Sequence, residues 1–495
     1  MPSRTTILLP PDGQLDVPAL RSALATRFRV EAHTRRLVQV RSLDTFDRRL
    51  VTAGLTLELR TAAGSAELVL TDQERELTAP ADGLRLPALA AALPPGPVRD
   101  RLAPVIDIRA LTDLGVQRRH QRPIDLRNRD DKIVVRVVVD EPDLVRVTPL
   151  RGYDSDARTA LRLLGGLGLR EAAAGAPAPD QPADGGPGPE APATTYVAHV
   201  LRGFLDVMSA NLPGLLDDVD TEFLHDFRVS VRRTRSTLKL GRPVLPGDLR
   251  ETWEPAFRWL GDLTTPVRDL DVYQLDLPTM AGWLVAADPA DLGALAEHLR
   301  RRRTAQRRRL VRGLRSPRYQ RLVEEWGVRL ADLADLTDLT GEEPPASEAA
   351  LALARSAIRR SGSRVMKDGS AVHADSAATD LHDLRKRCKE LRYALEVFAP
   401  LLDPSARKAL VTDLKVLQDV LGRFQDTEVQ RAGLRDFAEE MMRDGTPTEA
   451  VLALGELIGH LDAAQDAARL EFDDAFGRFA RPANRRRLAD LAGRS

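Results

Sequence analysis

The sequence predicts a multi-domain protein with an N-terminal α+β domain and a C-terminal all-α domain that is internally duplicated. Three observations support this fold class. The chain of 495 residues is too long to fold around one hydrophobic core. Apolar and polar residues alternate with the period of a strand only up to about residue 150, and a basic helical stretch at 224–240 returns at 381–398.

The N-terminal third of the chain mixes strand and helix signals. Alternation typical of half-buried strands occurs at 37–46, 55–60, 66–72 and 132–141. Amphipathic patterns at 15–28 and 154–169 predict two short helices. We therefore expect one α+β domain over residues 1–170.

A stretch without packing residues separates the two halves of the chain. Residues 171–194 read EAAAGAPAPDQPADGGPGPEAPAT, a composition typical of a disordered linker. After the linker, strand signals vanish and helical periodicity runs between Pro- or Gly-containing breaks, as at 196–211, 291–314 and 405–422. We expect an all-α bundle over residues 195–485.

Composition limits the classes of function. Lys+Arg and Asp+Glu both number 73, so attraction for a polyanion must come from segregated charge. The only cysteine, Cys388, excludes an internal disulfide and a cysteine-based zinc cluster. The start MPSRTTILLPPDGQ lacks the apolar core of a signal peptide, and no apolar run approaches the length of a membrane span. These features predict a cytoplasmic protein.

The stretch LHDFRVSVRRTRSTLKL at 224–240 places its cations on one helix face. At 100° per residue, His225 and four basic residues fall within a stripe of about 80°, beside an apolar stripe. Those basic residues are Arg228, Arg232, Arg235 and Lys239. A helix of this kind buries one face and presents an imidazole and four cations along the next.

A second copy, LHDLRKRCKELRYALEVF, keeps the register 157 residues later. Its equivalent residues are His382, Arg385, Lys389 and Arg392, whereas Glu396 stands where the first copy has Lys239. RDLDV at 268–272 and QDTEV at 425–429 repeat at the same offset. The repeat predicts a duplicated helical unit, with pseudo-twofold symmetry left open.

A basic helix face is usually no more than a solvated face, and that alternative stays open here. Against it, both stripes are almost purely positive, and like charges three and four residues apart repel unless an anion compensates. Arginine predominates, which favours bidentate contact with phosphate or carboxylate. General-base, metal-ligand and packing roles are conceivable for His225 and His382; we interpret both as hydrogen-bonding anion contacts.

The helical half resembles the CHAD family, helical domains with conserved histidines that bind inorganic polyphosphate. The resemblance rests on HDFRVSVRRTR, RDLDV, LHDLRKRCKELRYALEVF and LKVLQDVLGRFQD, in this order, and covers roughly residues 195–485. It implies two pseudo-symmetric halves around a basic cavity, with Asp269 and Asp426 orienting the cations. The implied anion contacts are His225, Arg228, Arg232, Arg235, Lys239, His382, Arg385, Lys389, Arg392 and Lys415.

The N-terminal domain is similar to the CYTH family, an antiparallel β-tunnel that binds triphosphate, on SLDTFDRRLVTAGLTLELR at 42–60 and on 104–142. Active members use an acidic ExExK strand to hold a divalent metal, but the corresponding strand here reads TTILLPP. Glu58 also stands where an arginine is usual, and only Arg60 is kept. We expect a degenerate, non-catalytic tunnel. Four further cations stay open as anion contacts or, as we favour, as a solvated face: Arg118, Arg119, Lys132 and Arg136.

The favoured function is non-catalytic binding of inorganic polyphosphate, with no cofactor and no metal site. The alternative is a metal-dependent triphosphatase in the N-terminal domain. Nucleic acid is disfavoured because only 4% of residues are aromatic and the stripes carry none for base stacking. We expect no membrane partner; a homodimer and association with polyphosphate granules stay open.

Overall fold

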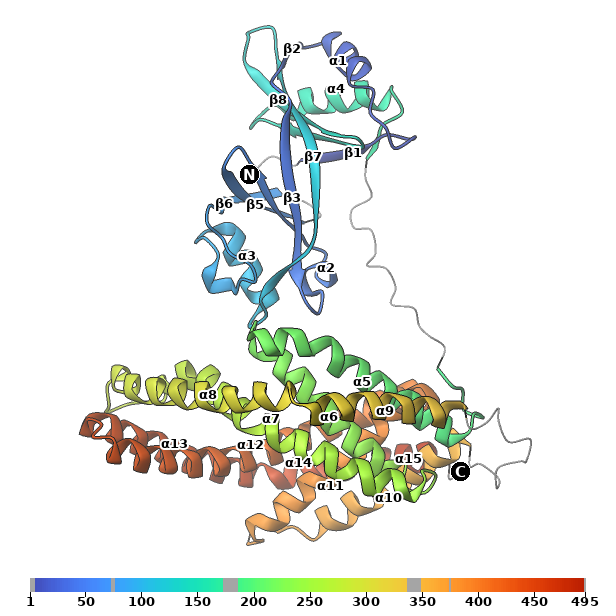
Figure 1. Ribbon diagram of the computed structural model, residues 1–495, viewed down its shortest axis with the longest axis vertical. Coiled ribbons are helices and arrows are strands. Elements are labelled where there is room, and N and C mark those ends of the chain that lie inside the picture. Colours follow the sequence, from blue (N-terminus) through green and yellow to red (C-terminus); the bar gives the residue numbers. More distant parts are fainter. Residues whose placement is uncertain (1–4, 73–75, 172–185, 336–348, 374, 494–495) are drawn as a thin grey trace. The chain divides into compact units, whose positions relative to one another are not determined.

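The computed structural model describes residues 5–72, 76–171, 186–335, 349–373 and 375–493 (Figure 1). The chain divides into two compact units, Met1–Pro182 and Ala183–Ser495. The division falls within the predicted linker 171–194, of which residues 172–185 lie outside the described residues. In the described part of the chain, no helix is long and apolar enough to cross a membrane.

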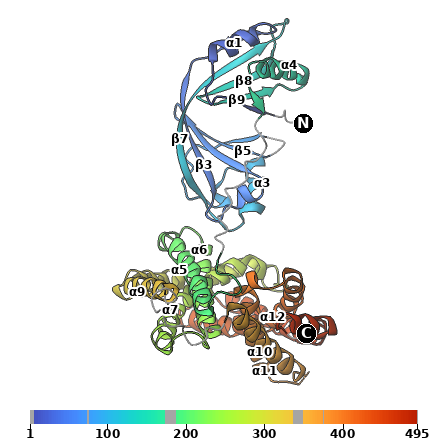
Figure 2. The same ribbon diagram turned by 90° about the vertical axis from the view of Figure 1, so that its right-hand side faces the viewer.

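The first unit is built on one antiparallel sheet that curls around a concave face (Figure 2). The strand order is β10-β1-β9-β8-β7-β3-β4-β5-β6, and β2 also pairs with β7. The strands are β1 (Thr6–Leu9), β2 (Arg29–Ala32), β3 (Arg36–Thr45), β4 (Thr56–Ala62), β5 (Ser65–Thr71), β6 (Glu76–Pro80), β7 (Leu111–Arg127), β8 (Ile133–Glu141), β9 (Leu144–Pro149) and β10 (Arg170–Glu171). The four strands predicted from alternation correspond to β3, β4, β5 and β8.

Two small cores cover the convex side of the sheet. Helices α1 (Val17–Ala25) and α4 (Asp154–Gly165) pack on β7, β8 and β9 through Leu24, Leu164 and the valines of β8. Helices α2 (Arg49–Thr52) and α3 (Pro97–Ile106), with the short η1 (Ala90–Ala92), pack on β4 and β5. Alternate residues of the strands are thus left for the concave face. The predicted α+β class with a curled antiparallel sheet is confirmed.

The second unit is helical throughout. Its helices are α5 (Ala193–Asp217), α6 (Thr221–Leu240), α7 (Gly247–Ala281), η2 (Pro289–Leu292), α8 (Gly293–Leu314), α9 (Pro317–Asp335), α10 (Ala350–Ser370), α11 (Ala378–Val397), η3 (Ala399–Leu401), α12 (Pro404–Arg443), α13 (Thr448–Leu470), α14 (Phe472–Ala480) and α15 (Pro482–Leu491). The first turn of α6 is capped by Asp220, whose carboxylate accepts the backbone N–H of Glu222 at 2.9 Å. The predicted all-α bundle is confirmed.

The duplication extends over the whole helical unit. α10, α11 and α12 each begin 157 residues after α5, α6 and α7. The relation also appears in contacts between equivalent residues: the hydroxyl of Tyr273 donates to the carbonyl of Gln430 at 3.1 Å, and Pro192 forms a β-bridge with Ala349. Contacts between a residue and its own repeat are expected on a twofold axis. The two halves are therefore related by pseudo-twofold symmetry.

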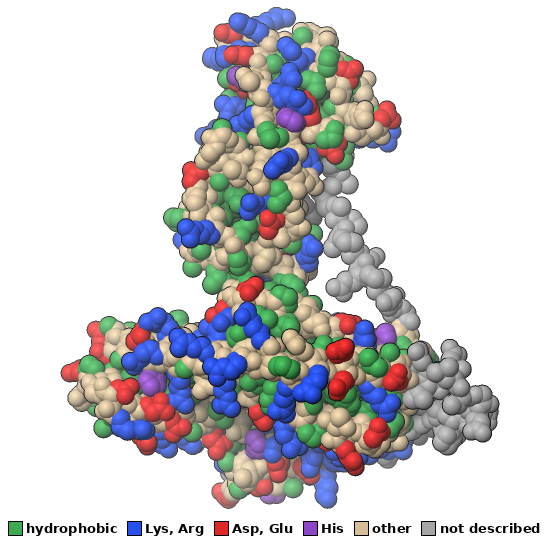
Figure 3. Space-filling model, viewed as in Figure 1, with side chains coloured by type: hydrophobic (Ala, Val, Ile, Leu, Met, Phe, Trp, Pro, Cys, Tyr) green, Lys and Arg blue, Asp and Glu red, His purple; other side chains and the backbone are tan. Residues whose placement is uncertain are grey.

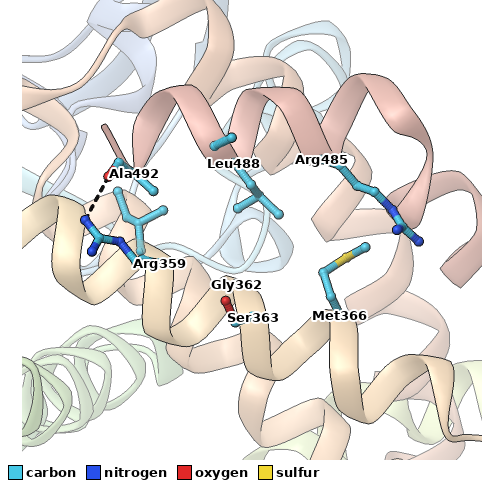
Figure 4. A pocket seen from close by; sticks show the side chains of 9 residues that line it. Arg359, Gly362, Ser363, Met366, Arg485, Leu488 and Ala492 are labelled. Atoms are coloured by element: carbon cyan, nitrogen blue, oxygen red, sulfur yellow. Dashed lines mark hydrogen bonds between the residues drawn. The ribbon is translucent and has the colours of Figure 1, made fainter. Parts of the chain in front are cut away.

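The halves differ at their ends. α9 is one helix, whereas its counterpart is broken into α14 and α15, with Pro482 at the start of α15, where proline is tolerated. Beside α15 lies a hollow of about 470 Å³, lined by Gly362 and Met366 of α10 and by Leu488 (Figure 4). Arg359 closes one end by donating to the carbonyl of Ala492 at 3.2 Å.

Candidate anion-binding site

The two copies of the basic helix pack against each other in antiparallel directions. Arg233 of α6 lies 3.3 Å from Glu396 of α11, and Lys239 of α6 forms an ion pair with Glu390 of α11. A step forward along α6 therefore corresponds to an equal step back along α11. The two ion pairs are equivalent under the repeat, because Arg233 matches Glu390 and Lys239 matches Glu396.

One basic cavity, here named the α10 cavity, lies between α6, α7, α10 and α11 and has a volume of about 760 Å³. Basic side chains dominate its lining. They are Arg232, Arg235, Lys239, Arg242, Arg258, Arg360, Arg364, Lys386 and Lys389. Only Glu254 and Glu390 oppose them within the lining. The cavity therefore presents positive charge from four different helices.

A second cavity, the α12 cavity, has a volume of about 400 Å³ and lies between α6, α11 and α12. Its basic lining residues are Arg232, Arg233, Arg385, Lys389, Arg392 and Arg423. It shares Arg232, Lys389 and Tyr393 with the α10 cavity, so the two adjoin. Together they are lined by thirteen basic and five acidic side chains. Segregated charge of this kind can attract a polyanion although the whole chain has no net charge.

Six of the ten predicted anion contacts line these cavities. They are Arg232, Arg235, Lys239, Arg385, Lys389 and Arg392. Three come from α6 and three from α11, so the antiparallel packing of the two copies brings both stripes together. The structure places the other four predicted residues elsewhere.

Arg228 belongs to the predicted stripe but is directed at α7. Its guanidinium donates to the hydroxyl of Thr265 and to the carbonyl of Gly261, the latter at 3.4 Å. Burial lowers the pKa of Arg228, with Asp269 opposing this effect and neighbouring arginines adding to it. The hydrogen bonds of Arg228 join α6 to α7.

His225 and His382 hold equivalent positions near the N-terminal ends of α6 and α11. His382 is half-buried, and its Nδ1 is hydrogen-bonded to the side-chain oxygen of Gln425 on α12. Burial and the positive charge of Arg268 on α7 lower the pKa of His225. Arg268 is the repeat equivalent of Gln425, so each histidine faces the same position of the following helix. Neither histidine lines the α10 or the α12 cavity.

Lys415 is exposed on α12, one turn before Gln418 and Asp419, which line the α12 cavity. Residues three and four positions apart share a helix face. Lys415 therefore lies on the face of α12 that borders the cavity, outside its lining.

Lys389, which lines both cavities, has a pKa well below the ordinary value of a lysine. Burial, together with the nearby Arg385 and Arg232, lowers the pKa of Lys389 to about 8. Among the described residues, no carboxylate lies within 4.0 Å of Lys389 or Arg232; Arg232 instead lies over the ring of Tyr393, 6.0 Å from its centroid. An ammonium group held among like charges favours a bound anion.

Carboxylates at the rim hold two of the other cations. Arg385 lies 3.0 Å from Asp426, the acid expected to orient it. Arg392 lies 2.6 Å from Glu396 and donates to the side-chain oxygen of Gln418 at 3.4 Å. These acids restrict the guanidinium groups without filling the cavity, an arrangement suited to repeated bidentate contacts with phosphate oxygens.

Several basic lining residues were not predicted. Arg360 and Arg364 come from α10, and they form a like-charged pair four residues apart, the same signal that singled out the stripes. Arg242, Arg258 and Arg423 come from three further segments. Their place in the cavities depends on how the helices pack, which periodicity does not predict.

Lys and Arg side chains also gather on the surface over α8 (Figure 3). Most of the arginine runs 300–303 and 307–309 have acidic neighbours: Arg300 lies 2.6 Å from Glu297, and Arg303 lies 2.5 Å from Asp271 and 2.7 Å from Asp218. The charge of these arginines is largely compensated within the helical unit, in contrast to that of the two cavities.

The concave face of the N-terminal sheet carries paired charges. Glu58 lies 2.7 Å from Arg60 and 3.8 Å from Arg146, Glu76 lies 3.9 Å from Arg60, and Asp140 forms a buried ion pair with Arg146. Burial lowers the pKa of Arg146 despite these acids. Each arginine is thus already neutralised by carboxylates of the same face.

The other cations singled out in this unit lie mostly in solvent. Arg118, Lys132 and Arg136 are exposed, and Arg136 lies 3.6 Å from Asp125. Arg119 is half-buried and donates to a carboxylate oxygen of Asp143 at 3.3 Å. This arrangement corresponds to the solvated sheet face that we favoured.

Comparisons with known proteins give a family match within the helical unit. Residues 199–435 match the CHAD domain family. The protein Rv2226 of Mycobacterium tuberculosis strain H37Rv is 30% identical over 216 residues, which cover 43% of this chain and 39% of that protein. The chain thus spans 39% of the length of the curated relatives that it matches.

The solved structures similar to this chain include a plant CHAD domain and a putative adenylyl cyclase. The CHAD domain from the plant Ricinus communis is 25% identical with a TM-score of 0.46, covering 62% of this chain and 93% of that one. A putative adenylyl cyclase from Hippeastrum, described as having a dominant triphosphatase activity, is 14% identical with a TM-score of 0.27, covering 35% of this chain and 91% of that one.

Proposed function

We propose that the helical unit, of which residues 199–435 match the CHAD domain family, binds inorganic polyphosphate in its two adjoining basic cavities and does not cleave it. The observation that carries this proposal is the joint lining of thirteen basic and five acidic side chains. A linear chain with a negative charge on every phosphate can contact many of these cations at once. A single small anion would leave most of them uncompensated.

The identity of the cations supports a phosphate ligand. Ten of the thirteen are arginines, whose planar guanidinium groups bind phosphate oxygens bidentately. Tyr393 is the one aromatic side chain in the two linings, and it already lies beside Arg232. Single-stranded nucleic acid needs aromatic platforms for its bases, so this lining favours polyphosphate over RNA.

The N-terminal unit does not offer the donor set that a catalytic divalent cation requires. β1 carries no acidic residue, and within the described ranges no three His, Cys, Asp or Glu side chains cluster as a metal site. The carboxylates of the concave face, Glu58, Glu76 and Asp140, are instead held by Arg60 and Arg146. These residues do not fit a bound Mg²⁺ or Mn²⁺, and the proposed function includes no phosphoryl transfer.

The test uses the full chain with long-chain polyphosphate in the presence of Mg²⁺ and Mn²⁺. We expect the protein to retain polyphosphate while the chain length, read by gel electrophoresis, stays unchanged. Arg232→Ala, Arg385→Ala and Lys389→Ala together should reduce the affinity by at least two orders of magnitude, because charge-assisted hydrogen bonds contribute roughly 1.5–3 kcal/mol each. They should also flatten the dependence of affinity on salt, by about 0.7 in logarithmic slope per lost phosphate contact.

A matched control removes the same amount of charge away from the cavities. Arg308, Lys367 and Lys408 are exposed and line neither cavity. Changing all three to Ala should leave the affinity within about threefold of the unmodified protein, because exposed charges are screened. Equal losses in the two triple variants would refute the site, and shortening of the polyphosphate would refute the non-catalytic proposal.

A further inference from the structure

A third cavity of the helical unit, here named the α5 cavity, differs in chemistry from the two basic ones. Its volume is about 840 Å³, and it is formed by α5, α6, the end of α11 and the segment before α5. The lining residues are Gly186, Pro187, Tyr196, His199, Val200, Gly203, Phe204, Val207, Asp226, Val229, Ser230, Arg233, Tyr393, Glu396, Val397 and Pro400. Most of them are apolar.

The α5 cavity is the pseudo-twofold counterpart of the α10 cavity. A shift of 157 residues maps ten of its lining residues onto lining residues of the α10 cavity. On the helix that begins each half, Val200, Gly203, Phe204 and Val207 match Ala357, Arg360, Ser361 and Arg364. The duplication therefore produced two equivalent hollows of similar size, about 840 and 760 Å³.

Four of the substitutions between the two hollows remove positive charge from the α5 side, and one, Arg233 in place of Glu390, works in the opposite direction. Arg360, Arg364 and Lys386 of the α10 cavity are matched by Gly203, Val207 and Val229, and Lys239 is matched by Glu396. A polyanion suited to the first hollow would meet apolar side chains and a carboxylate in the second.

The charges that remain in the α5 cavity are mostly compensated. Arg233 lies 3.3 Å from Glu396, and Glu396 also accepts a hydrogen bond from Arg392 at 2.6 Å. Asp226 stands at the wall beside the histidine of the first stripe. Without an uncompensated cation to fix an anion, burial of apolar surface is the main source of affinity that the cavity offers.

We propose that the α5 cavity binds a small, uncharged and largely apolar molecule. Its volume lies within the roughly 300–1,000 Å³ of small-molecule pockets, which are lined mainly by apolar side chains with a few polar groups that orient the ligand. Phe204, Val207 and Val229 provide the apolar wall, and Ser230 and Tyr393 provide hydroxyl groups. This assignment does not depend on what the basic cavities bind.

The experiment uses Nile red, an uncharged apolar dye whose emission rises in an apolar environment, with the full chain. We expect a saturable rise in emission at about one dye per chain. Gly203→Arg with Val207→Arg reinstates the cations of the α10 cavity and should weaken dye binding at least tenfold. Gly203 has open space around its Cβ direction and Val207 is 43% exposed, so both arginines can be accommodated.

The control tests whether any exposed apolar residue attracts the dye. Leu452 on α13 is 66% exposed, and Leu452→Arg should leave dye binding unchanged. Circular dichroism checks the folding of each variant; if the double variant loses helical signal, Val229→Lys, which introduces the residue type of Lys386, gives the same test.

Three results would overturn the proposal. They are the absence of saturable dye binding to the unmodified protein, equal binding by a folded charge-reinstating variant, and one-for-one displacement of the dye by long-chain polyphosphate. The last result would place the dye in the basic cavities. A dye that stays bound in excess polyphosphate supports a separate site.

Discussion

Raising the pH from about 7 to about 9 should weaken polyphosphate binding through one side chain, Lys389. Burial, Arg385 and Arg232 lower the pKa of Lys389 to about 8, well below the ordinary lysine value. Its ammonium form is therefore the main form below pH 8 and is lost as the pH rises through 8. A bound anion favours the charged form, so binding above pH 8 must take up a proton.

The size of the effect follows from this pKa. With a pKa of about 8, Lys389 is about nine-tenths protonated at pH 7 and about one-tenth protonated at pH 9. If polyphosphate binds only the ammonium form, its Kd rises about tenfold between these two values, which corresponds to about 1.4 kcal/mol.

The assay is fluorescence anisotropy of end-labelled polyphosphate at fixed ionic strength across this pH range. The matched variant is Lys389→Arg, because a guanidinium stays charged throughout the range. We expect the tenfold change in the unmodified protein and a nearly constant Kd in the variant. The same pH dependence in both proteins would refute the assignment of the effect to Lys389.

Three further changes test other parts of the structure. Lys389→Met removes a half-buried cation from like-charged neighbours, so the Tm of the ligand-free protein should rise by about 2 °C. Differential scanning fluorimetry measures the Tm, and a lower Tm would show that repulsion among these cations does not destabilise the protein. Glu396→Arg should destabilise the helical unit, and adding Arg233→Glu should partly restore its stability. In a double-mutant cycle followed by urea unfolding, we expect a coupling free energy of about 0.5–1 kcal/mol, whereas additive effects would show that the pair does not interact. Asp140→Ala removes the nearest carboxylate from the buried cation of Arg146 and should cost the N-terminal unit about 3 kcal/mol of unfolding free energy. Adding Arg146→Met should recover most of this loss, and a failure to recover it would argue against the ion pair as the cause.

The face of each basic helix could be predicted from the sequence because helical periodicity alone decides which side chains share a face. That argument grouped Arg232 and Arg235 on α6 with their counterparts Lys389 and Arg392 on α11, and all four side chains line the cavities. Periodicity could not separate Arg228 from this group. The guanidinium of Arg228 donates a hydrogen bond to Thr265 on α7, and this contact depends on how the two helices pack. The same limit applies to Arg360 on α10, which reaches the cavity only through tertiary packing.

In the N-terminal unit, too, the sequence predicts the elements but not the contacts between them. Alternation in the sequence predicted β8, for example, because one face of this strand is buried against helices. In the sequence, Glu58 stands out as a carboxylate at a position where an arginine is usual. In the folded sheet Glu58 also neutralises Arg60 and Arg146, two positions that lie on different strands and that alternation cannot relate.

The ion pairs between α6 and α11 bear on how the two halves can associate. The first half contributes Arg233 and Lys239 to this contact, and the second half contributes Glu390 and Glu396. If two copies of the first half met about a true twofold axis, arginine would face lysine, and two copies of the second half would bring glutamates face to face. Each half has thus become electrostatically complementary to the other and repulsive toward itself. The duplicated domain thus resembles a heterodimer within one chain, in which the charges at this contact disfavour a symmetric assembly of either half alone.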